Sequence, residues 1–244
     1  MIGGELLQSI EVVKVQTPDM DGQGIGGTVN VVTKGPFDYE RPRFTLGSAQ
    51  VGYDELNDET PYAADFVVGG TTESGNVGWL LGAAYSYRDA ASHGVYQDDW
   101  REVELDGIAS TVPENAKNNI YSLERQRQSA NAALEWRPTD ASKYYVRAFY
   151  SKYDEDEVRQ RYEHFFSRDI TELGPTTGVS GTSNRREQDL RLEEKDKRFF
   201  NVAVGGENMF GERWTLAYAL QANDNQQMEP NRSEEHTSEL QSPI

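Results

Sequence analysis

Two patterns between positions 19 and 30 have the composition of ligand-binding loops. Gly22–Gly27 read GQGIGG and match the G-x-G-x-x-G spacing with which dinucleotide-binding proteins approach a pyrophosphate. That fingerprint needs a helix directly after it, whereas the β-branched run Thr28–Thr33 predicts a strand. Asp19 and Asp21 resemble the start of a calcium loop, but Asn30 stands where an EF-hand needs its terminal glutamate. We therefore interpret this stretch as a tight backbone turn, which glycine favours because it reaches positive φ without penalty.

Groups suited to catalysis are sparse in the rest of the chain. There is no cysteine, and neither G-x-S-x-G nor H-E-x-x-H occurs. His93 and His164 are far apart and have no metal-ligand spacing, and we interpret the acidic run Asp154–Glu157 as a solvated loop base rather than a cation site. We predict no enzyme activity, no cofactor and no metal. Two acids distant in sequence can still form a glycosidase site, so an enzyme on a β scaffold stays open as an alternative.

The net charge of the chain indicates which kinds of partner it is unsuited to bind. Among 244 residues, 24 Lys and Arg face 41 Asp and Glu, which gives a formal net charge of −17. Phosphate binding needs clustered basic side chains, so this composition argues against nucleic acid. No run approaches the roughly 18–20 consecutive apolar residues of a spanning helix. That test does not detect the strands of a membrane barrel, because only every second residue of such a strand faces lipid.

Alternation of apolar with polar or small residues predicts strands. The clearest case is Trp79–Arg88, in which Trp79, Leu81, Ala83, Tyr85 and Tyr87 share one face. Six further segments show this rhythm: Arg43–Tyr53, Tyr62–Thr71, Ala130–Arg137, Tyr144–Tyr150, Phe200–Val204 and Trp214–Leu220. Within Arg43–Tyr53 the apolar phase changes midway, which indicates either a β-bulge or a segment that is not a regular strand.

The connections between these segments alternate between short and long. The short ones are Thr72–Val77, Pro138–Ser142 and Gly211–Arg213, and the long ones are about Asp54–Pro61, Ala90–Tyr121 and Glu155–Leu190. Membrane barrels have short turns at one end and long loops at the other. A soluble sandwich has no reason to place every long loop at one end.

Aromatic residues gather beside the short turns. Trp79, Trp136, Tyr144 and Trp214 all project from the apolar face there, which predicts an aromatic girdle at one membrane interface. The alternative is that they are core residues of a soluble sheet, since aromatics favour strands in general. Trp100 falls in a long connection and belongs to neither group.

The segment Ile10–Lys34 carries a family resemblance. Its β-branched runs Ile10–Val15 and Thr28–Thr33 flank the Gly/Asp/Pro loop and are followed by aromatic-tipped strands. This order resembles the end of the plug domain of TonB-dependent outer-membrane receptors and the first strands of their barrel. The resemblance implies an all-β fold: a partial transmembrane antiparallel β-barrel of about seven strands, forming an open curved sheet, with a remnant of the plug domain. It assigns 1–36 to the plug and 37–231 to the barrel, and it makes Asp19, Asp21, Gly24, Gly26, Gly27 and Asn30 a plug-loop motif.

The resemblance also implies a function and partners. The expected activity is TonB-coupled active uptake of a scarce ligand, of siderophore or saccharide type, across a Gram-negative bacterial outer membrane. The partners would be outer-membrane lipid, the small ligand and the TonB–ExbB–ExbD energy-transducing complex, which acts through an N-terminal box missing from this sequence. We expect a truncated chain that is inactive alone. Arg232–Ser242 resembles translated sequencing adapter, so we expect 232–244 to be a non-native tail.

Five aromatic residues in the long connections are the candidates for ligand stacking: Tyr96, Trp100, Tyr162, Phe165 and Phe166. Aromatic rings suit planar ligands and sugars, although loop aromatics also pack on one another. The alternative to a transporter is a soluble or surface β-rich binding module without a transport role. That module would fold in buffer without detergent.

Overall fold

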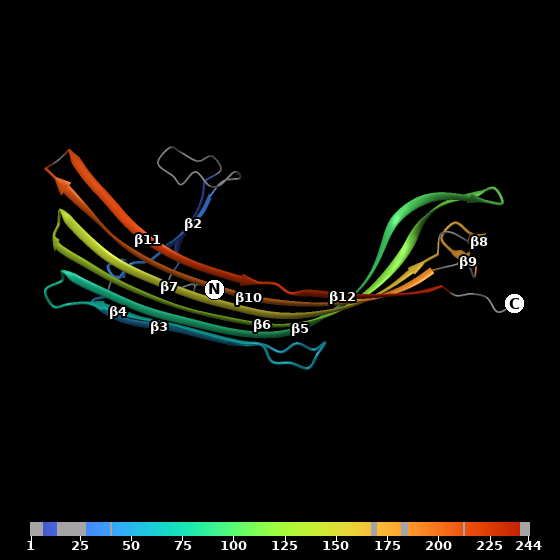
Figure 1. Ribbon diagram of the computed structural model, residues 1–244, viewed down its shortest axis with the longest axis horizontal. Helices are drawn as coiled ribbons and strands as arrows, with labels where there is room; N and C mark the ends of the chain where they lie inside the picture. Colours follow the sequence, from blue (N-terminus) through green and yellow to red (C-terminus); the bar gives the residue numbers. More distant parts are fainter. Residues whose placement is uncertain are drawn as a thin grey trace.

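The computed structural model describes residues 7–13, 28–39, 41–166, 170–181, 185–211 and 213–239, and this part of the chain is all-β (Figure 1). Within it, no helix has the length and apolarity needed to cross a membrane. The main feature is an open antiparallel sheet in which seven strands run in the order β11-β10-β7-β6-β5-β4-β3. Their bounds are Arg43–Val51 (β3), Tyr62–Thr71 (β4), Val77–Leu105 (β5), Ile108–Thr139 (β6), Ser142–Phe165 (β7), Arg185–Phe210 (β10) and Trp214–Met228 (β11).

Five shorter strands complete the structure. Leu7–Val13 (β1) pairs with Thr28–Thr33 (β2), and Ile170–Leu173 (β8) pairs with Gly178–Ser180 (β9). Asn231–Glu239 (β12) follows β11 along the same edge of β10, with Glu229 and Pro230 between them. The segment that we expected to be a non-native tail therefore pairs with the sheet as far as residue 239.

The strand predictions hold where one face of the sheet is apolar. The segment Tyr62–Thr71 coincides with β4, and all seven predicted segments fall on the seven strands of the large sheet. The β-bulge is wrong, because β3 pairs with β4 without a register shift from Arg43 opposite Gly70 to Val51 opposite Tyr62. The phase changes because Phe44 packs into a small core on one face, whereas Ala49 and Val51 lie on the other.

Two of the predicted long loops are mostly strand. Residues 90–121 form one antiparallel hairpin from β5 into β6, and β7, β8, β9 and β10 together cover most of 155–190. The β5–β6 hairpin reverses at Asp106 and Gly107, whose φ angles of 52° and 77° are those of a two-residue type I′ turn. The third connection, around Asp54–Pro61, is a loop, closed by an isolated bridge between Asp54 and Glu59.

The buried apolar core is small and lies near the short turns. Phe44, Val67 and Leu80 form it, and Tyr39 and Ala133 pack against it. Tyr39 stacks on Phe44 with ring centroids 3.9 Å apart. The rest of the large sheet has no second layer among the described residues, so most of its side chains meet solvent on one face or the other.

Candidate functional site

One face of the large sheet carries a continuous apolar surface, which we name the apolar band. Directly opposed residues of an antiparallel pair share a face, so the register defines its rows. One row runs through Trp79, Leu134, Val146, Val204 and Leu220, and the next through Leu81, Ala132, Ala148, Val202 and Ala222. The five large side chains of the first row are each 38–79% exposed, so this face is apolar without being covered.

Aromatic side chains mark both edges of the apolar band. At the short-turn edge lie the four residues predicted from sequence: Trp79, Trp136, Tyr144 and Trp214. Trp136 and Tyr144 are directly opposed, with ring centroids 5.4 Å apart. At the far edge lie Tyr62, Tyr85, Tyr87, Tyr150 and Phe200, which sequence reasoning did not single out. They could have been recognised from the sequence, because each aromatic lies at or near the end of an alternating segment that is farther from the short turns.

The apolar band crosses the strands obliquely. Tyr218 belongs to a row of directly opposed residues that ends on β5 at Val77. On β5, Trp79 lies two residues beyond this row, away from the short turns. On β11, Trp214 lies four residues before it, nearer to the short turns. This six-residue displacement is about 20 Å along the strands, over four strand spacings of about 4.8 Å, and so corresponds to an inclination of about 45°. The band covers nine residues on β5, Trp79–Tyr87, and nine on β11, Trp214–Ala222.

The opposite face, which we name the polar face, carries the buried charged and polar groups. Six polar residues of the described chain are less than 9% exposed, and the register places all of them on this face: Asn115, Ser129, Glu135, Glu155, Glu163 and Asp189. The four acids among them each pair with a lysine or arginine side chain. The two faces therefore differ in chemistry along the same strands.

At the short-turn end of the polar face, residues 34–39 form an anchor. Pro36 is fully buried, and a Cβ atom on Gly78 would lie 2.9 Å from Pro36 and 2.8 Å from Phe37. The Arg137 guanidinium lies 4.1 Å from the centroid of the Phe37 ring and also pairs with Glu135 at 2.6 Å. The anchor fixes the chain that leads from β2 to the sheet.

We predict that Gly78→Val releases this anchor. A branched side chain cannot share the space of Pro36 and Phe37, and overpacking costs about 1–3 kcal/mol. Trypsin cleavage after Lys34 should then accelerate roughly tenfold, since local opening controls access. Ser86→Val, on the same strand and face but away from the anchor, is the control. Equal cleavage rates in both variants would contradict the anchoring role.

Beyond the apolar band, the polar face holds a charged cluster that joins three strands. Arg125 of β6, Glu155 of β7 and Lys195 of β10 are directly opposed. Lys195 Nζ lies 2.8 Å from one carboxylate oxygen of Glu155, and the other oxygen accepts hydrogen bonds from Arg125 and the Tyr153 hydroxyl. A single buried carboxylate is thus satisfied by three donors.

These contacts change the proton affinity of the cluster. Burial alone would raise the pKa of Glu155, but hydrogen bonds from Lys195, Tyr153 and Arg125 outweigh it and lower that pKa to about 2. The hydrogen bond to Glu155 raises the pKa of Lys195, and burial together with the Glu155 contact raises the pKa of Tyr153. Glu155 and Lys195 are therefore both ionised at neutral pH, and their ion pair links β7 to β10.

A second charged group lies farther along the same face. Asp189 pairs with Arg159 at 2.8 Å and with Arg161 at 3.5 Å, and Glu163 pairs with Lys117 at 3.6 Å. Neither group resembles a catalytic or metal centre. Among the residues that the structure describes, no cluster of three His, Cys, Asp or Glu side chains could hold a metal ion.

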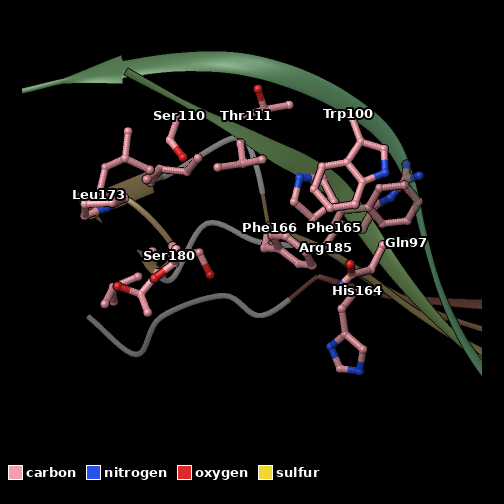
Figure 2. A pocket seen from close by; sticks show the side chains of 18 of the residues that line it. Gln97, Trp100, Ser110, Thr111, His164, Phe165, Phe166, Leu173, Ser180 and Arg185 are labelled. Carbon is pink, nitrogen blue, oxygen red and sulfur yellow. The ribbon is translucent and has the colours of Figure 1, made fainter. Parts of the chain in front are cut away.

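The distal end of the sheet contains a cleft of about 580 Å³. It lies between the end of the β5–β6 hairpin and the β8–β9 hairpin, and Figure 2 shows Trp100, Phe165 and Phe166 along it. These are three of the five predicted stacking residues. Contrary to the sequence prediction, Trp100 lies on β5 and Phe165 on β7 rather than on loops, and Phe166 directly follows β7.

The other two candidates are not brought together with them. Tyr96 lies on β5 opposite Lys117, and its ring folds over Gly94. Tyr162 lies on β7 with its hydroxyl 3.4 Å from the Gln188 amide, on the face opposite to Phe165 because the two positions differ by three residues. Both are exposed strand residues outside the cleft lining.

The plug-loop motif cannot be placed in the same way. Asp19, Asp21, Gly24, Gly26 and Gly27 lie outside the described residues. Asn30 lies on β2, opposite Glu11 of β1. Thr28–Thr33 forms strand β2, as its composition predicted. The described part of the other run, residues 10–13, lies on β1, which pairs with β2 in antiparallel orientation.

No family model, curated protein or solved structure matches this chain. Three features of the chain itself bear on its function: the apolar band, the polar face and the distal cleft.

Proposed function

We propose that this chain is part of a TonB-dependent outer-membrane receptor, with the apolar band facing lipid. The band itself carries the proposal: it is apolar, exposed, edged by aromatics on both sides and inclined to the strands by about 45°. Strands of membrane barrels have this inclination and span the bilayer with about 9–11 residues. The nine-residue extents on β5 and β11 fit that length.

The polar face then corresponds to the interior of a barrel. Lumen-facing residues of membrane barrels are polar, and buried ion pairs such as that of Glu135 with Arg137 belong there more readily than in lipid. Strands that continue beyond the band, with charges on both faces, would project from the membrane. The anchor at residues 34–39 would join the N-terminal strands β1 and β2 to the lumen side.

In this proposal, the function is energy-coupled uptake of a scarce small ligand of siderophore or saccharide type. Ligand would bind on the projecting part, and the TonB–ExbB–ExbD complex would drive its release inward. External energy is needed because ligand binding can shift the balance between two receptor conformations only as far as the ligand's affinities for them differ. The sequence resemblance of Ile10–Lys34 to the end of a plug domain supports this over other membrane barrels.

Single-cysteine labelling tests the proposal, since the chain has no native cysteine. Cysteines at Asn131, Ala132, Ala133 and Leu134 would carry an environment-sensitive fluorophore after refolding in detergent micelles. We expect blue-shifted emission at Ala132 and Leu134 only, because these two face outward in the apolar band. The matched control is a set of cysteines beyond the band, at Asn118, Asn119, Ile120 and Tyr121. The emission of the fluorophore should not alternate between blue-shifted and unshifted along these four positions.

The opposite result would favour the soluble binding module. If the chain folds in buffer without detergent and emission does not alternate at residues 131–134, the band is not a lipid-facing surface. A soluble monomer rarely exposes an apolar patch of more than a few hundred Å², which is why we rank this alternative second.

A further inference from the structure

The distal cleft combines an aromatic wall with a positive charge. Trp100 of β5 and the consecutive residues Phe165 and Phe166 at the end of β7 provide flat apolar surfaces (Figure 2). The Arg185 guanidinium lies 4.3 Å from the centroid of the Phe165 ring. Phe165 and Arg185 are directly opposed on β7 and β10, so the strand register fixes this pair in place.

The charge of the cleft contrasts with that of the chain. The formal net charge is −17, yet none of the described residues that line the cleft is acidic. Arg185 and Arg186 both line it, and His164 lies at its border with the ring directed away from Trp100 (Figure 2). Arg185 pairs with Glu187 at 2.6 Å, but its side chain is still 39% exposed and a guanidinium has five donors. The cleft can therefore accept an anion.

Hydroxyl and amide groups complete the lining. Ser110 and Thr111 come from β6, Thr177 and Ser180 from the β8–β9 hairpin, and Gln97 from β5. Such groups donate and accept hydrogen bonds in several directions, which matches a ligand that carries several hydroxyls. Aromatic rings in turn match the flat C–H faces of sugar rings.

We propose that the distal cleft binds an acidic saccharide, with Arg185 contacting its carboxylate and Trp100 and Phe165 stacking on its rings. This inference rests on the proposed function, because it names the class of ligand that the receptor would take up. A planar guanidinium pairs with a carboxylate through two parallel hydrogen bonds, and the ring of Phe165 holds that plane in position.

The test uses trigalacturonate and its methyl ester, which have nearly the same shape and differ in charge. Binding to the full chain in detergent would be measured by isothermal titration calorimetry. We expect trigalacturonate to bind at least tenfold more tightly than its ester. Arg185→Gln should weaken trigalacturonate binding at least tenfold and remove the preference over the ester. Arg191→Gln, which deletes a positive charge from the same strand and face outside the cleft, should leave both affinities unchanged.

Two outcomes would overturn the inference. If acid and ester bind equally, the cleft does not recognise a carboxylate. If neither binds, while the fluorophore-labelled chain still shows a lipid-facing band, the cleft is not a site for acidic saccharides and the proposed receptor function stands. Trp100→Leu gives an independent check, because it should weaken both probes to the same extent by removing the stacking surface.

Discussion

Arginine at Ala132 is expected to destabilise the fold of this chain in detergent or lipid by about 2–4 kcal/mol, whereas arginine at the neighbouring Asn131 should be tolerated. Ala132 lies in the middle of the apolar band, between Leu81 and Ala148. Asn131 lies on the polar face, between Gly82 and Phe149. A charge on the lipid side of a membrane barrel costs about 2–4 kcal/mol at the bilayer midplane, and a charge in the lumen costs far less.

Denaturant unfolding in micelles, followed by circular dichroism, would measure the difference between these two variants. The two positions are adjacent on β6 but lie on opposite faces, and both variants introduce the same charge. A destabilisation of Ala132→Arg by about 2 kcal/mol or more relative to Asn131→Arg supports a lipid-facing band. If Ala132→Arg is harmless and folds in plain buffer, the face meets water and the transporter proposal fails.

Replacing Glu155 by glutamine should remove an acid-sensitive part of the stability. The folded pKa of Glu155 is about 2, below its ordinary value near 4.5, so the folded state favours the ionised form. The resulting stabilisation is fully present above pH 4.5 and disappears as the pH falls towards 2. Its size, from the difference in pKa, is about 3 kcal/mol. Glu155→Gln should therefore be less stable than the native chain at pH 7 and equally stable near pH 2.

The control for this prediction is Asp156→Asn. Asp156 is the next residue on β7, is exposed and lies on the opposite face, so its replacement should change stability little at any pH. Unfolding midpoints at pH 7, 4 and 2 would separate the variants. If the gap between native chain and Glu155→Gln is the same at pH 7 and pH 2, the cluster of Arg125, Glu155 and Lys195 does not stabilise the fold through the carboxylate charge.

Much of the fold could be predicted from sequence because the two faces differ within the apolar band. Trp79, Leu81 and Ala83 alternate with smaller or polar residues, and that period locates the strand. Beyond the band both faces of the strands are polar, so apolar and polar residues no longer alternate along the sequence. Residues 90–121 therefore have the composition of a loop although they form strands. Asp106-Gly107, a two-residue hairpin signal between Leu105 and Ile108, was present in the sequence and could have corrected that interpretation.

The candidate site was less predictable than the strands. Sequence composition suggested five stacking aromatics, but whether they meet depends on strand register. Phe165 and Tyr162 are three residues apart and thus lie on opposite faces. Trp100 lies near Phe165 because their partners on β6, Pro113 and Asn115, are two residues apart. The pairing of Arg185 with Phe165 is equally a matter of register between β7 and β10. These two residues are twenty positions apart in the sequence, and no local pattern predicts that they pair.

The turn at Asp106 and Gly107 also sets the order in which the longest hairpin can assemble. Closing a two-residue loop costs little chain entropy, and each further pair from Leu105–Ile108 towards Val77–Trp136 then adds next to one already formed. Hairpins of this kind zip within microseconds once they nucleate. We expect the nucleus to lie at the distal, water-exposed tip and the apolar rows to pair last. The apolar rows have the greatest tendency to aggregate, and they stay unpaired longest. A bilayer that binds these rows early should therefore raise the yield of folded chain.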